Sequence, residues 1–113
     1  PDAVFIHKKG YLYYVNQAAK RLMRVDSTED VVGTNMDDYL KMCPGYIEVN
    51  KERQTAIANN DKNLPPWICK FQRRDGTIVE TEIMSVPIVI DGRPMVQIVA
   101  RDITERVEME ESE

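Results

Sequence analysis

The sequence predicts an α+β domain in which one five-stranded antiparallel sheet carries short helices on one face. Two short runs of β-branched and aromatic residues open the chain, helix-forming segments occupy its middle, and three longer alternating runs close it. Strands joined by tight turns pair in the antiparallel direction, and helices grouped between them cover one face of the sheet. The length of 113 residues allows one domain with one core.

The first elements are a hairpin and a helix. Residues 3–8 and 11–15 are rich in strand-forming residues, and Gly10 between them can take the positive φ of a tight turn. Asn16 precedes a run of helix formers over 17–23, so we expect its side chain to cap that helix.

Three further helical segments are expected in the middle of the chain. Residues 27–30 begin with a capping pattern, residues 36–41 form a turn or two, and residues 46–59 form the longest helix. One stripe of that helix consists of Tyr46, Val49, Arg53 and Ile57.

The rest of the chain predicts three strands in a meander. Asp75-Gly76 and Asp91-Gly92 are hairpin turn sequences. Pro87 marks a bulge or an edge position, because proline cannot donate to a strand ladder. The strands are expected over 67–74, 77–90 and 93–103.

The last two strands are apolar on both faces toward one end. One face of each packs under the helices, and a domain of this length has no helices left for the other face. We therefore expect the outer face to pair with a second copy of the chain, through Met84, Val86, Ile88, Met95, Gln97 and Val99.

The charge is concentrated at the end of the chain. The net charge is −4, and residues 105–113, with five acids and one base, account for all of it. We expect this segment to begin a helix that leaves the domain, so the domain itself spans residues 1–104. A pI near 5.1 argues against nucleic-acid binding, and no apolar run has the length of a membrane helix.

The two cysteines predict neither a disulfide framework nor a metal site. Cys43 and Cys69 have no metal-ligand spacing, and their small number is typical of a reducing compartment. We therefore expect a cytoplasmic domain, whose parent protein can still be anchored in a membrane.

Several segments, taken in order, resemble PAS domains. The resemblance covers nearly the whole chain, and its most specific part is the last segment. The matching segments are residues 10–19 (G-Y-L-Y-Y-V-N-Q-A-A), 29–33 (E-D-V-V-G), 73–77 (R-R-D-G-T), 85–88 (S-V-P-I) and 100–106 (A-R-D-I-T-E-R).

This resemblance implies a sheet in the order 2-1-5-4-3 and a sensory or dimerisation module within a larger signalling protein. The output domain expected in the same chain is a two-component histidine kinase. The resemblance also implies that Asp102 and Thr104 anchor an exiting signalling helix, which would pass on shifts of the last strand.

The PAS fold encloses a cavity, and its candidate lining residues are Trp67, Cys69, Phe71, Thr81, Ile83, Ser85, Ile98 and Ala100. Flavin photochemistry requires a cysteine that residues 46–50 lack, and haem ligation requires a histidine in the long helix, whereas His7 lies in the first strand. We expect no tightly bound cofactor and no metal. A small metabolite, or a flavin held non-covalently beside Trp67, is the alternative.

Catalysis is not expected. The chain lacks a phosphate-binding glycine loop and a convincing nucleophile–base set, and Glu80 and Glu82 are interpreted as solvent-facing strand residues.

Overall fold

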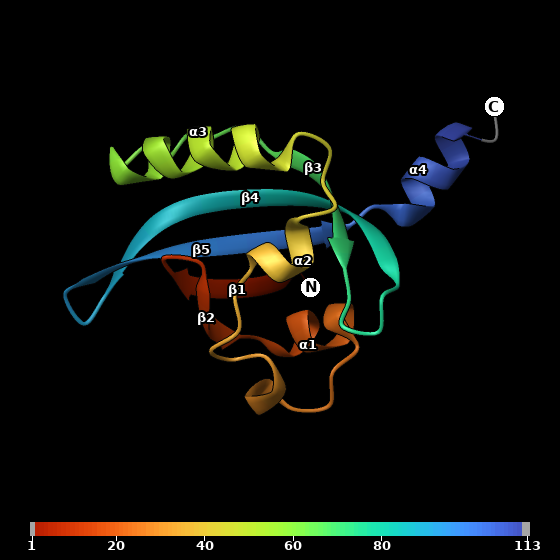
Figure 1. Cartoon of the computed structure of the whole chain (residues 1–113), viewed down its shortest axis with the longest axis horizontal. Helices are drawn as coiled ribbons and strands as arrows, with labels where there is room; N and C mark the ends of the chain where they lie inside the picture. The colour runs from red at the N-terminus through yellow and green to blue at the C-terminus, as the bar shows by residue number, and fades with distance from the viewer. Residues whose placement is uncertain (1, 112–113) are drawn as a thin grey trace.

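A five-stranded antiparallel sheet in the order β2-β1-β5-β4-β3 forms the centre of the domain (Figure 1). The structure is a computed structural model, and residues 2–111 are the part of the chain that it describes. The fold class and the strand order are those predicted from the sequence. The strands are β1 (Ala3–Lys8), β2 (Tyr11–Val15), β3 (Trp67–Gln72), β4 (Ile78–Ile90) and β5 (Arg93–Asp102).

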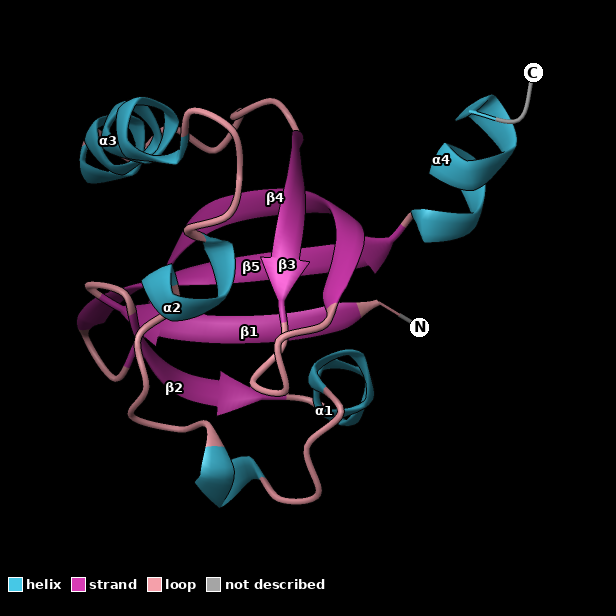
Figure 2. Ribbon diagram, turned by 45° about the vertical axis from the view of Figure 1, so that its right-hand side comes forward, coloured by secondary structure: helices cyan, strands magenta, loops and turns pink. Residues whose placement is uncertain are grey.

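Four helices accompany the sheet (Figure 2). The capping prediction for the first one is confirmed, because Asn16 Oδ1 accepts a hydrogen bond from the Ala19 amide at 2.8 Å. The same oxygen accepts from the Val4 amide at 3.0 Å and so ties the helix to β1. The helices are α1 (Gln17–Met23), α2 (Asp37–Leu40), α3 (Tyr46–Ala58) and α4 (Thr104–Glu111), with a 3₁₀ turn at Thr28–Asp30.

Aromatic side chains fill the core between the sheet and the first two helices. Phe5 of β1 and Phe71 of β3 are fully buried, with their ring centroids 5.8 Å apart. The ring of Tyr39 in α2 also stacks on Phe71, with the two ring centroids 5.6 Å apart. Burial of such rings supplies much of the stability of a small domain.

The register of β4 explains its proline. β3 pairs only with residues 78–83 of β4, so residues 84–90 have a neighbour on the β5 side alone. Pro87 pairs opposite Val96 in this edge half without a register shift, which is the edge alternative of the prediction. The register shift in the sheet lies instead between Ile6 and His7.

The sequence predicts no disulfide framework and a reducing compartment, yet the two cysteines are bonded to each other in this structure. A disulfide joins Cys43, in the turn between α2 and α3, to Cys69 of β3, with a Cα–Cα distance of 5.1 Å. The contact is not visible from spacing, because 26 residues separate the two cysteines and only the packing of α2 over β3 brings them together.

Candidate functional site

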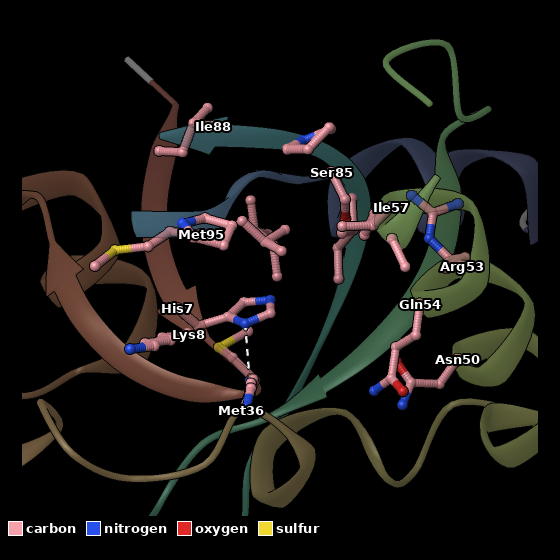
Figure 3. Close-up of a pocket in the computed structure, with 18 of the residues that line it drawn as sticks. His7, Lys8, Met36, Asn50, Arg53, Gln54, Ile57, Ser85, Ile88 and Met95 are labelled. Atoms are coloured by element: carbon pink, nitrogen blue, oxygen red, sulfur yellow. Dashed lines mark hydrogen bonds between the residues drawn. The ribbon is translucent and has the colours of Figure 1, made fainter. Parts of the chain in front are cut away.

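A cavity of about 750 Å³ lies between α3 and the inner face of β4 and β5 (Figure 3). It exists because α3 contributes little to the core: of its 13 residues, only Arg53 is buried. The cavity reaches solvent near the β4–β5 hairpin, where Val89 is 71% exposed. Its size is within the range of ordinary small-molecule sites.

The predicted pocket residues fall into two groups. Trp67, Ile83, Ser85 and Ile98 line the cavity. The other four lie below it in the closed core, each 2% exposed or less, and they are Cys69, Phe71, Thr81 and Ala100. The Thr81 hydroxyl has its own partner there, since it donates to the Cys69 carbonyl at 2.7 Å.

Sequence reasoning missed the polar part of the wall. The sequence places Arg53 on one stripe of the long helix but does not predict a role for it in the pocket. Alternation along the first strand could have found His7, because Phe5 and His7 share a face. The missed lining residues include His7, Met36, Asn50, Arg53, Gln54 and Ile57.

His7 is held in one orientation. Its Nδ1 accepts a hydrogen bond from the Gly10 amide at 3.0 Å, which leaves Nε2 to carry the proton (Figure 3). Burial lowers the pKa of His7, and the nearby Asp37 carboxylate opposes that shift. A neutral imidazole with an N–H group at Nε2 is therefore the form in the cavity wall at neutral pH.

Acid should destabilise the domain through His7. The unfolded chain takes up a proton near the ordinary pKa of about 6.5, whereas folded His7 resists it, so the folded state loses stability as the pH falls below that value. The loss is at most about 1.4 kcal/mol per pH unit. Urea unfolding at pH 7.5 and 5.5 should show a larger drop for the wild type than for His7→Gln, whose amide oxygen can still accept from Gly10. An equal loss of unfolding free energy in the wild type and in His7→Gln would contradict this account.

The junction between β5 and α4 fastens the exiting helix to β4. The Asp102 carboxylate accepts from the Thr104 amide at 2.9 Å and caps α4. The Thr104 hydroxyl accepts from the Glu80 amide at 3.2 Å, and the Ile103 amide donates to the Glu80 carbonyl at 2.9 Å. Residues 112–113, the end of the segment expected to be helical, lie outside the described residues.

The outer face of the sheet presents an apolar patch. Val99 pairs with Val4 on one side and Met84 on the other, and all three are at least partly exposed. Two of the predicted dimer-face residues, Ile88 and Met95, lie at the hairpin end and border the cavity. We call the following residues the outer patch: Val4, Ile6, Met84, Val86, Gln97 and Val99.

Metal-binding clusters and membrane-spanning helices are both absent from the part of the chain that the structure describes. Residues 2–111 contain no group of three side chains suited to hold a metal ion. In the same range, none of the helices combines the length and the apolar character that crossing a membrane requires.

The sheet order 2-1-5-4-3, the short helices beside a cavity and the helix that follows β5 are the architecture of the PAS fold. The PAS domain family matches residues 1–105. The chain belongs to this family, whose members are generally sensory and non-catalytic.

Similar proteins agree with this assignment. The chain is 30% identical to sporulation kinase A of Bacillus subtilis (strain 168), over 97% of this chain and 18% of the kinase. The PAS domain of an HTR-like protein from Haloarcula marismortui superposes with a TM-score of 0.72 and 20% identity, covering 91% of this chain and 82% of that one. An RNA-binding light-oxygen-voltage receptor superposes with a TM-score of 0.74 and 26% sequence identity, covering 95% of this chain and 31% of that one.

Proposed function

We propose that this chain is the regulatory PAS domain of a two-component sensor histidine kinase. The similarity to sporulation kinase A supports this, although the chain spans only about a fifth of that protein. Under this proposal the chain itself is non-catalytic and cytoplasmic, and its output is a kinase domain in the same protein.

The observation that carries the proposal is the attachment of α4 to β4. Glu80 contributes both its backbone amide and its carbonyl to the junction, and Arg106 of α4 lies 3.8 Å from the Glu82 carboxylate. Because β4 and β5 also form the floor of the cavity, a shift of these strands would move the first turn of α4.

Dimerisation is the second part of the proposal. The outer patch joins β1, β4 and β5 into one apolar surface. A sheet face of this kind on a single domain is suited to a two-fold contact with its own copy. Pairing would bring two copies of α4 into one assembly, from which a change in the angle of the helices could reach an output domain.

Hydrogen exchange tests the junction directly. Thr104→Ala removes the hydroxyl that accepts from the Glu80 amide, and the loss of one such bond costs about 1 kcal/mol. Exchange of the Glu80 amide and of the first-turn amides of α4 should accelerate about fivefold. Thr104→Ser keeps the hydroxyl and should exchange like the wild type. Equal exchange in all three proteins would refute coupling at this point.

The cavity favours a second candidate, a sensor whose pocket is occupied by a small molecule. Its volume and its mixed polar and apolar wall support this alternative. For both candidate functions, we propose that the domain requires no tightly bound cofactor.

A further inference from the structure

The cavity carries a charge bias opposite to that of the chain. The chain has a net charge of −4, yet its cavity is lined by four basic side chains and one carboxylate. That carboxylate, Asp37, already accepts a hydrogen bond from the Tyr46 hydroxyl. The basic residues are Lys8, Lys9, Arg53 and Lys62.

Arg53 is the one buried residue among these four basic residues. Arg53 is 8% exposed, and this burial lowers the pKa of its guanidinium group. Nη1 donates to the Pro65 carbonyl at 2.8 Å, whereas Nη2 is buried and has no hydrogen-bond partner within residues 2–111. A buried charged donor without a partner is costly, so the site as it stands lacks an acceptor and a negative charge.

The protein holds this guanidinium in place. The Arg53 Cζ atom lies 5.7 Å from the centre of the Trp67 ring, and Trp67 in turn stacks on Tyr46 with centroids 5.8 Å apart. The cation–π contact and the Pro65 carbonyl orient Arg53 without neutralising it. An anion entering the cavity would meet a charge that is already positioned.

His7 adds a second donor in the same cavity. Its Nδ1 is occupied by Gly10, so the remaining ring nitrogen, Nε2, offers an N–H group and no lone pair (Figure 3). A neutral donor and a cation in the same wall favour ligands that carry oxygen acceptors. The rest of the cavity wall includes apolar side chains, among them Met36, Ile57, Ile83 and Ile98.

We propose that the cavity binds a small organic carboxylate with an apolar body, its carboxylate paired with Arg53 and a further acceptor atom near His7. One buried guanidinium beside apolar side chains suits a carboxylate on an apolar body better than a phosphate dianion, and the cavity contains no glycine-rich phosphate loop. This inference rests on the proposed function, because the ligand acts as a signal only in a sensory domain. It adds the chemical class of that ligand.

Calorimetry on the 113-residue chain tests this class with matched probes. Benzoate and hexanoate should bind at least about tenfold more tightly than benzamide and hexanamide, and benzylamine and hexylamine should not bind. Phenyl phosphate is the arm for a phosphate ligand, and tighter binding of it than of benzoate overturns the carboxylate assignment. Equal binding of acid and amide, or no binding of either acid up to millimolar concentration, also overturns it.

Variants assign the binding to Arg53. Arg53→Met keeps the length of the side chain but not the charge, and should lose about tenfold or more in affinity for the acids while its amide binding is unchanged. Arg21→Met, on the exposed surface of α1, is the matched control and should bind like the wild type. Unchanged acid binding by Arg53→Met overturns the proposal.

Wild-type protein provides a test that does not depend on the folding of a variant. In NMR titrations, the Arg53 guanidinium and His7 imidazole signals should shift with benzoate and not with benzamide. Shifts confined to the exposed lysines would contradict the site. Carboxylate binding with unchanged exchange in the Thr104 variants would leave this inference standing and refute the relay, so the two failures are distinguishable.

Discussion

Val99→Arg should convert a dimer of this domain into a monomer. Val99 lies in the middle of the outer patch, between Val4 of β1 and Met84 of β4. In a two-fold contact, the arginine of each copy would be buried against apolar side chains without a carboxylate, at a cost of about 3 kcal/mol. The dissociation constant of the dimer should therefore rise roughly a hundredfold, as measured by sedimentation equilibrium.

A matched control separates this effect from a general effect of added charge. Val32→Arg places the same substitution on an exposed side chain outside the sheet and should leave the dimer intact. A wild type that stays monomeric at every concentration, or a Val99→Arg protein that remains dimeric, would contradict the outer-patch assignment.

Reduction of the disulfide should cost the domain about 3 kcal/mol of unfolding free energy. The Cys43–Cys69 bond closes a loop of 26 residues and so restricts the unfolded chain. Chemical denaturation with and without dithiothreitol should show this difference for the wild type. The double variant Cys43→Ser/Cys69→Ser should be as weak as the reduced protein and insensitive to the reagent.

Alkylation followed by mass spectrometry checks the bond itself. Protein purified without reductant should gain no alkyl groups when unfolded, and two after reduction. Two reactive thiols before reduction, together with equal stability in both conditions, would show that the pair is not bonded. Because disulfides are rare in the cytosol, the result also bears on the proposed cytoplasmic location.

Local chemistry made the elements predictable. Gly10, Asp75-Gly76 and Asp91-Gly92 each provide the positive φ that a tight hairpin needs, and the strands flank them as expected. Asn16 has a cap geometry that depends on residues within three positions. Such features are encoded over a few residues, so the strand limits were predicted to within about two positions.

The site was only partly predictable because it depends on distances between elements. Alternation along β4 places Ile83 and Ser85 on the inner face, but it does not show where the core ends and the cavity begins. That boundary is set by the position of α3, which buries only one of its residues, Arg53. The disulfide escaped prediction for the same reason, since α2 brings Cys43 to β3 only in the folded chain.

The central claim is that the junction at Thr104 passes the state of the sheet to an output kinase. The most direct measurement is the autophosphorylation rate of the intact protein that carries this domain, compared for wild type, Thr104→Ala and Thr104→Ser. The account predicts that Thr104→Ala changes the rate severalfold and that Thr104→Ser matches the wild type, because only the alanine loses the bond to the Glu80 amide. Equal rates for all three proteins would contradict it.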